Sequence, residues 1–217
     1  MLVVSPHLDD GVFGCGDLLS LHPESIVVTV FAGAPAPDRA LTDWDRACGF
    51  RCAAEVMPAR RREDAAALAV LDARPVWLDF LDAQYGQASH PDDLNAALDA
   101  VLRTESVRTI AFPLGLFHDD HRTTSAAMLA LAASADGLTW LLYADALYRF
   151  IPGLRANRLA ELQADGYRLV PWPEHGVASQ RKRTAVACYS SQLRALARPG
   201  HVPVDTLFAP EQYWQIA

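Results

Sequence analysis

Residues 2–19, LVVSPHLDDGVFGCGDLL, contain the turn on which the predicted fold of this chain depends. The apolar residues 2–4 predict a short strand, and the apolar segment around Leu18 and Leu19 predicts a helix. The polar residues 6–10 between them should therefore form a strand-to-helix turn. In open α/β sheets ligands bind beyond the carboxyl ends of the strands, so we expect a ligand or an active site at this turn.

This turn carries an imidazole and two carboxylates, those of His7, Asp9 and Asp10. A neutral His nitrogen and an ionised Asp oxygen both suit Zn²⁺, while a second carboxylate can act as a base. Neighbouring side chains in a turning segment point in different directions. We therefore expect one carboxylate to bind a metal and the other to take a proton. The alternative is a polar loop in which Asp10 stabilises a helix N-terminus.

A second polar cluster, PLGLFHDDH, occupies residues 113–121. It follows the strand-like residues 109–112 and precedes a helical segment over about residues 123–133, so both clusters should lie at one edge of the sheet. A catalytic zinc takes three protein ligands and keeps an open position for water. His7, Asp10 and one of His118 or His121 meet that requirement.

Together the two clusters resemble the signatures of a known enzyme family. Residues 7–11 are similar to the His-Pro-Asp-Asp-Glu signature of the PIG-L/LmbE-like zinc-dependent N-acetylglucosaminyl deacetylases, and residues 118–121 resemble their downstream His-x-Asp-His signature. The resemblance spans nearly the whole chain, with weaker similarities at residues 61–64, Asp82, Lys182 and residues 189–192.

The resemblance implies a zinc-dependent hydrolase that removes an acyl group, most simply acetyl, from an amine. Zn²⁺, or another divalent transition metal, would be held by His7, Asp10 and His121. Asp9 would be the general base that takes a proton from the attacking water. His118 would donate to the oxyanion, and either protonated Asp9 or His118 would deliver a proton to the departing amine.

The implied substrate is a small molecule or conjugate with an N-acetylglucosamine-like amide. Arg61 and Asp82 are the candidate substrate-binding residues, and a plain salt bridge or a charge at a helix start is the alternative for both. The chain departs from the family pattern at Leu8, Gly11 and Asp119, which stand where Pro, Glu and Pro are usual. Neither Leu8 nor Gly11 stands at a metal-donor position of the pattern, so we expect zinc binding to survive. We expect the two residues to alter the pocket beside the metal, and with it the substrate.

Strand candidates alternate with helix-length segments along the 217 residues, which predicts βαβ units and a mainly parallel sheet. The expected fold class is α/β, a Rossmann-like sheet flanked by helices with a C-terminal elaboration, in a single domain over residues 1–217. The spacing of apolar residues predicts the clearest helix at residues 92–103. Strands are expected at residues 2–5, 26–31, 76–80, 109–112 and 138–143, followed by a strand at 146–151, a helix at 159–163, a strand at 167–170 and a helix at 179–194.

The segment between the second and third predicted strands is longer than a minimal crossover and begins with the proline-rich residues 34–38. It should lie over the same edge of the sheet as the two clusters. Residues 42–46 either face the substrate, with Trp44 as an aromatic platform, or begin a helix with Trp44 in the core.

The composition limits the classes of partner. A net charge of −7 and a pI near 5.4 disfavour nucleic acid, which requires concentrated Lys and Arg. No apolar run approaches the roughly 20 residues that cross a bilayer, and residues 1–4 lack the basic start of a signal peptide. We therefore expect a cytoplasmic protein without a transmembrane segment. Four Cys do not indicate a disulfide framework, and a homo-oligomer is compatible with the sequence.

Two other functions compete with hydrolysis. Gly11, Gly14 and Gly16 after a first strand suggest a Rossmann-type nucleotide-binding turn, but Leu19 occupies the third glycine position of the fingerprint. The acidic loop would also repel a pyrophosphate. The other alternative is a family-like protein that is catalytically silent and only binds a ligand. The intact set of His and Asp residues argues against it.

Overall fold

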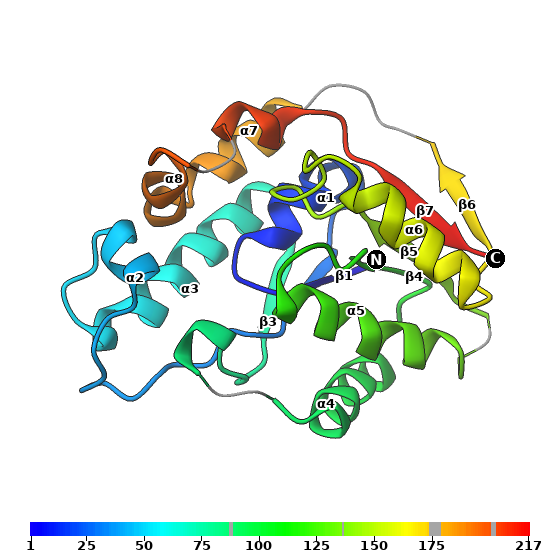
Figure 1. The fold of residues 1–217 in the computed structure, drawn as a ribbon, viewed down its shortest axis with the longest axis horizontal. Helices are drawn as coiled ribbons and strands as arrows, with labels where there is room; N and C mark the ends of the chain where they lie inside the picture. The colour runs from blue at the N-terminus through cyan, green and yellow to red at the C-terminus, as the bar shows by residue number, and fades with distance from the viewer. Residues whose placement is uncertain (87–88, 136, 174–178, 201–202) are drawn as a thin grey trace.

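The computed structural model describes residues 1–86, 89–135, 137–173, 179–200 and 203–217. Within these residues, seven strands form one sheet in the order β3-β2-β1-β4-β5-β7-β6 (Figure 1). Strands β1 to β5 are parallel, whereas β7 runs antiparallel to both β5 and β6. The strands are β1 (Leu2–Ser5), β2 (Ile26–Thr29), β3 (Arg74–Trp77), β4 (Thr109–Pro113), β5 (Thr139–Tyr143), β6 (Leu169–Trp172) and β7 (Tyr213–Ile216). The predicted α/β class with a mainly parallel sheet is confirmed.

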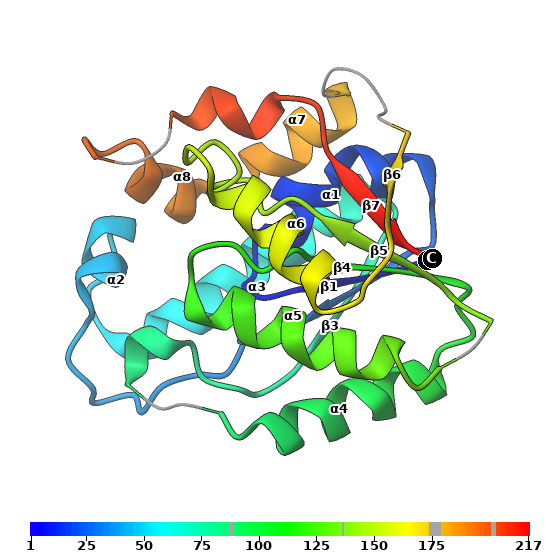
Figure 2. The same ribbon diagram turned by 45° about the vertical axis from the view of Figure 1, so that its right-hand side comes forward.

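Helices cover both faces of the sheet (Figures 1 and 2). One buried core joins α1, α3 and α7 to the sheet, and the other joins α4, α5 and α6 to it. The helices are α1 (Asp10–Leu21), α2 (Asp43–Cys48), α3 (Ala53–Val70), α4 (Pro91–Thr104), α5 (Asp119–Ala132), α6 (Leu154–Ala164), α7 (Gln180–Ala187) and α8 (Ser190–Leu196), with short 3₁₀ helices η1 (Ala83–Tyr85) and η2 (Val204–Phe208). No helix among the described residues is both long and apolar enough to span a bilayer.

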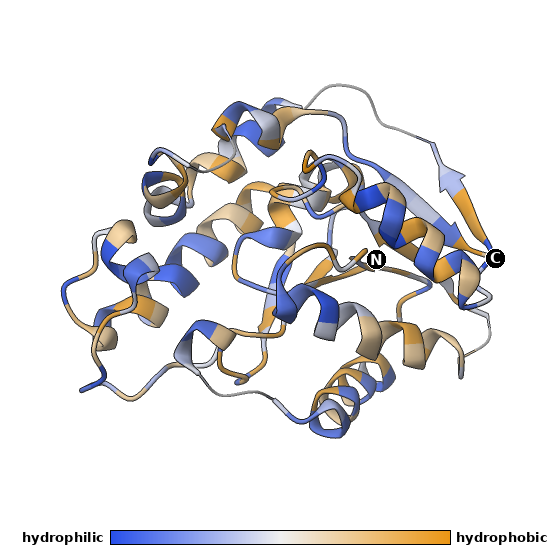
Figure 3. Cartoon of the chain, in the orientation of Figure 1, coloured by the Kyte–Doolittle hydropathy of each residue, from blue (hydrophilic) through white to orange (hydrophobic). Residues whose placement is uncertain are grey.

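The central strand β1 is buried on both sides. Leu2 and Val4 contribute to the core under α4 and α5, and Val3 contributes to the core under α1 and α3. Successive side chains of a strand point to opposite faces, so a strand covered on both faces must be apolar throughout. Figure 3 shows this as hydrophobic colour along the central strands.

The strand order reverses between β1 and β4. From β1 the chain builds outward through β2 to β3, and it then returns to the other side of β1 to build β4 and β5. The carboxyl ends of β1 and β4 therefore flank a topological switch point, where α/β sheets bind their ligands. Both polar clusters of the sequence follow these two strand ends.

Close packing accounts for two of the three glycines in the first turn and helix. A Cβ atom at Gly14 would lie 2.8 Å from the ring of Tyr143, and one at Gly16 would lie 2.8 Å from Cγ of Lys182. These glycines let α1 approach β5 and α7. Their presence therefore requires no nucleotide.

The strand predicted at residues 146–151 is wrong. The amides of Tyr148 and Arg149 donate to the carbonyl of Asp145 at 3.1 and 3.0 Å, so the chain turns after β5. The position beside β5 is filled by β7, which the sequence analysis did not identify, in antiparallel register. The C-terminal elaboration thus adds an antiparallel pair of strands, β7 and β6, to the parallel sheet, with α7 and α8 between them along the chain.

Other predicted elements are present with shifted boundaries. The helix predicted at residues 92–103 is confirmed as α4. The helix predicted at 179–194 is divided into α7 and α8, with the predicted cap Ser179 accepting from the amide of Lys182. The second strand ends at Thr29, and the third begins earlier than predicted, at Arg74. Helix α5 begins at Asp119, α6 is longer than predicted, and β6 begins later, at Leu169.

Candidate active site

The turn after β1 is closed by its own polar groups. The Ser5 hydroxyl donates to the carbonyl of His7 (2.5 Å) and accepts from the amide of Gly11 (2.7 Å). The amide of His7 in turn donates to Oδ2 of Asp10 (3.0 Å). These bonds hold His7 and Asp10 side by side at the end of the strand, where both are buried.

His7, Asp10 and His121 place three metal donors around one point. Oδ2 of Asp10 lies 3.0 Å from Nδ1 of His7 and 3.0 Å from Nε2 of His121. The donor atoms of all three residues lie within 4.8 Å of one another. Tetrahedral ligands at about 2.0–2.2 Å from a zinc lie about 3.3–3.6 Å apart, so this group fits a divalent transition metal. Three protein donors leave the fourth position open.

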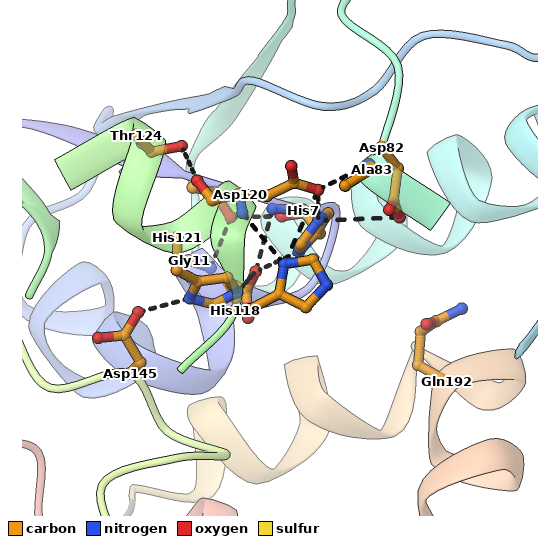
Figure 4. Close-up of polar contacts among 12 residues, drawn as sticks. His7, Gly11, Asp82, Ala83, His118, Asp120, His121, Thr124, Asp145 and Gln192 are labelled. Atoms are coloured by element: carbon orange, nitrogen blue, oxygen red, sulfur yellow. Dashed lines mark hydrogen bonds and ion pairs between the residues drawn. The ribbon is translucent and has the colours of Figure 1, made fainter. Parts of the chain in front are cut away.

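Each imidazole of this group contacts a further carboxylate through the ring nitrogen that does not face Asp10 (Figure 4). Oδ2 of Asp120 lies 2.9 Å from Nε2 of His7, and Oδ1 of Asp145 lies 2.5 Å from Nδ1 of His121. Such carboxylate–histidine pairs orient metal-binding imidazoles and raise their basicity. Asp145 is itself fixed by the amides of residues 115–116 at 3.1 and 3.2 Å. Neither aspartate was predicted to have a role, although Asp120 lies within the second cluster.

The carboxylates around the buried imidazoles favour positive charge. Burial lowers the pKa of His7, but Asp82, Asp10 and Asp120 outweigh that effect and raise the pKa well above its usual range. Burial also lowers the pKa of His121, yet Asp10 and Asp145 raise it to about 9. A bound divalent cation would balance the negative charge of these carboxylates, as protons on the two rings do.

Asp9 differs from its neighbour Asp10. Its side chain lines the pocket, but it belongs to neither group of potential metal donors among the described residues. Burial and the adjacent Asp10 raise the pKa of Asp9 to about 6, against a smaller opposing effect of Arg60. Burial raises the pKa of Asp10 as well, but His121 and His7 together hold it below its usual range. Two carboxylates with separated pKa values suit different roles.

A second group of potential donors overlaps the first. His7, Asp82, His118 and Asp120 also place ligand atoms within 4.8 Å of one another. Oδ2 of Asp82 lies 3.7 Å from Nε2 of His7. The two groups share His7, and four protein donors would close a zinc site. The group with Asp10 is therefore the better candidate for catalysis.

His118 is the N-cap of helix α5. Its Nδ1 accepts from the amide of Asp120 at 3.2 Å, so in the neutral imidazole the proton lies on Nε2. Burial, together with His7 and His121, lowers the pKa of His118, and the neutral form is therefore favoured near pH 7. The side chain lines the pocket and is 33% exposed, so its Nε2–H can donate to a substrate oxygen.

The arginine in this pocket is Arg60 rather than the predicted Arg61. The guanidinium of Arg61 donates to the carbonyl of Ala32 at 3.2 and 2.7 Å and lies over the ring of Trp77 at 5.4 Å. Consecutive residues of a helix point about 100° apart. The side chain of Arg61, the predicted substrate contact, therefore lies outside the pocket, and that of its neighbour Arg60 lines it.

Arg60 is 3% exposed, and its Nε and Nη1 have no hydrogen-bond partner among the described residues. Buried polar groups are almost always satisfied. Arg60 lines the pocket together with Asp9 and Asp82, so an acceptor on a bound molecule can supply the missing bonds.

The pocket beside these groups has a volume of about 200 Å³. Asp82 lines it, as the sequence analysis expected, and so does Trp44. The helix start expected at residues 42–46 is present, since α2 begins at Asp43, and Trp44 is half-buried and lines the pocket. Nε1 of Trp44 donates to Oε1 of Gln192 at 3.0 Å. Helices α2 and α8 thereby form one wall, where Gln192 lines the pocket apart from the histidines (Figure 4).

Comparisons with known proteins show which family and which solved structures this chain is similar to. Residues 2–132 match the model of the PIG-L family, described as GlcNAc-PI de-N-acetylase. No curated protein sequence gives a significant match. The structure is similar to that of the A40926 pseudoaglycone deacetylase Dbv21, with 26% identity, a TM-score of 0.77, and 99% of this chain and 95% of that chain covered.

Two more distant structures share the fold. The zinc-inhibited form of teicoplanin deacetylase Orf2 is 22% identical, with a TM-score of 0.77 over 100% of this chain and 97% of that one. The N,N'-diacetylchitobiose deacetylase from Pyrococcus horikoshii is 17% identical, with a TM-score of 0.59 over 99% of this chain and 82% of that one.

Proposed function

The chain belongs to the PIG-L family of de-N-acetylases, and we propose that it removes an acyl group, most simply acetyl, from the amine of an N-acetylglucosamine-like small molecule or conjugate. The observation that carries this proposal is the group of His7, Asp10 and His121 beside Asp9 and His118 at the switch point. The similarity to a pseudoaglycone deacetylase supports the reaction class. We further propose that residues 1–217 act as one domain.

Zn²⁺ is the proposed cofactor, held by His7, Asp10 and His121. When bound, the metal would polarise the amide carbonyl and lower the pKa of a water towards 7. The donor set supports this choice, because two imidazoles and one carboxylate suit zinc, and the carboxylates behind the imidazoles keep them oriented.

Asp9 and His118 are the proposed acid-base and polarising groups. Asp9 lines the pocket without belonging to either donor group, and it takes the proton from the attacking water. His118 donates Nε2–H to the oxygen that becomes negative as the carbonyl is attacked. The proton on Asp9 then goes to the departing amine. A small acid and a free amine are the products.

Asp145 is expected to control metal affinity through His121. The Asp145→Asn variant should bind Zn²⁺ about 10- to 100-fold more weakly, because it loses the negative charge that orients and polarises the ligand imidazole. Competition with a chromophoric chelator measures this, and melting of the metal-free protein detects any folding defect. Asp119→Asn is the matched control, since Asp119 is exposed on the first turn of α5, the helix that carries His121. Equal zinc affinity in the two variants would show that Asp145 has no such role.

Arg60 is expected to bind substrate, and Arg61 is not. Arg60→Ala should lower kcat/KM about 10- to 100-fold, in line with the loss of charge-assisted hydrogen bonds. Arg61→Ala should stay within about twofold of the unmodified enzyme, because its guanidinium contacts Ala32 and Trp77 outside the pocket. Steady-state kinetics with matched zinc content compare the two. A larger loss of kcat/KM in Arg61→Ala than in Arg60→Ala would show that Arg61, and not Arg60, contacts the substrate.

The experiment that tests the function is a panel of N-acetylated amino sugars and their conjugates, screened for release of free amine. Chelator treatment should abolish release, and added Zn²⁺ should restore it. Protein that releases amine from no member of the panel, and that binds no divalent metal, would contradict the proposal. A thermal shift with a dinucleotide and indifference to chelators would favour the nucleotide-binding alternative.

A further inference from the structure

An exposed aromatic side chain contacts Tyr148, which lines the pocket. Phe117 is 63% exposed and directly precedes His118 in the loop between β4 and α5. Building on the proposed function, we propose that Phe117 and Tyr148 form an apolar platform that binds an apolar group attached to the N-acylated substrate. Phe117 is thereby a specificity-determining residue.

The backbone at Phe117 argues for a functional side chain. Its φ is +61°, in the left-handed region that favours glycine and that bulky residues seldom adopt. Strained non-glycine residues of this kind cluster at ligand-binding positions. A glycine would relieve the strain, and the exposed ring of Phe117 contributes little burial in return.

Ring contacts connect Phe117 to the candidate metal site. Its ring lies 5.2 Å from that of Tyr148 at an interplanar angle of 32°. The ring of Tyr148 lies 5.2 Å from that of His121 at 79°. Leu147 and Tyr148 line the pocket. An apolar wall therefore continues from a candidate metal ligand to the protein surface.

Apart from Trp44, the remaining residues that line the pocket are polar, with Arg60, Asp82 and Gln84 suited to hydroxyl groups of a sugar. An apolar group on the same molecule would extend along Tyr148 and cover Phe117. It can be attached at either end of the amide, as an aryl or alkyl aglycone on the sugar or as an acyl chain longer than acetyl. Both have the same chemistry, and the experiment separates them.

The first test compares kcat/KM for matched probes. N-acetylglucosamine is compared with 4-nitrophenyl N-acetyl-β-glucosaminide and, separately, with N-octanoylglucosamine. The unmodified enzyme should prefer at least one apolar probe by about 10-fold, the scale of a well-placed apolar contact. Phe117→Gly should remove that preference while changing turnover of N-acetylglucosamine by less than about twofold. The probe that loses its advantage shows which end of the substrate the platform binds.

The control is Glu24→Gly. Glu24 has the same φ of +61° but lies on an exposed turn between α1 and β2, so this variant should relieve backbone strain without changing the preference. Both glycine variants should melt at or above the temperature of the unmodified protein. A large fall in the melting temperature of Phe117→Gly alone would show a packing role for the ring and overturn the proposal. So would an unmodified enzyme without the preference, or a preference that survives Phe117→Gly.

A binding measurement keeps this inference separate from the proposed function. If no probe is hydrolysed, titration calorimetry with octyl N-acetyl-β-glucosaminide and with N-octanoylglucosamine still compares the two proteins. The unmodified protein should bind at least one of them about 5- to 10-fold more tightly than Phe117→Gly does. Equal affinity for both compounds would reject the platform whether or not the chain is a deacetylase.

Discussion

Asp10→Ala protein is expected to retain less than about one tenth of the bound metal and to release amine at least about 10³-fold more slowly than the unmodified enzyme. Asp10 is the anionic member of the donor group, and its Oδ2 lies 3.0 Å from a nitrogen of each imidazole. Its loss leaves two neutral nitrogens, which cannot hold the metal in a three-ligand site. Elemental analysis after gel filtration measures the metal, and amine release measures the rate.

Asp82→Ala is the control for this experiment, since Asp82 belongs to the other donor group. It should keep its metal and lose mainly substrate affinity. If Asp82→Ala strips the metal and Asp10→Ala does not, the four-donor group holds it. That outcome would also remove the open coordination position on which the proposed hydrolysis depends.

The central strand and the candidate metal donors were predictable because local sequence carries them. Three consecutive apolar residues followed by a polar turn indicate a strand buried on both faces, and β1 is that strand. His7 and Asp10 come directly after it, and His118 and His121 follow the next inner strand, β4. Parallel strands bring their carboxyl ends to one edge, so sequence position alone placed these residues near one another.

Contacts that depend on the neighbours of a strand or on the rotation of a helix were not predictable. Asp145 contacts His121 only because β5 lies beside β4 in the sheet, and nothing around residue 145 indicates this partner. Helix α3 carries alanine and arginine on several sides, so its rotation, and with it the choice of Arg60 over Arg61, was open. Residues 146–151 were predicted as a strand because they are mostly apolar, and nothing in the sequence showed that β7 rather than this segment pairs with β5.

Asp9→Asn protein is expected to keep its metal and lose about 10²- to 10⁴-fold in kcat, the usual contribution of a general base. Asp9 belongs to neither donor group, so its loss should leave the metal donors in place. As a base it must be ionised, and burial with the adjacent Asp10 raises its pKa to about 6. A bound cation favours the carboxylate and so lowers the pKa of Asp9. The kcat/KM of the unmodified enzyme should therefore fall about tenfold per pH unit once the pH is below the pKa that Asp9 has with the metal bound.

The matched variant for this last experiment is His118→Ala. It should also keep the metal and lose about 10²- to 10³-fold in kcat, since it removes a donor to the developing oxyanion.

The two variants differ in their pH profiles. The fall in kcat/KM at acid pH should persist in His118→Ala, because Asp9 still titrates, and should disappear in Asp9→Asn. The neutral form of His118 is already favoured near pH 7, so its loss should leave the acid side of the profile in place. Zinc content and pH–rate profiles of both variants decide the roles: loss of metal from His118→Ala, or an acid limb that survives Asp9→Asn, contradicts the assignment.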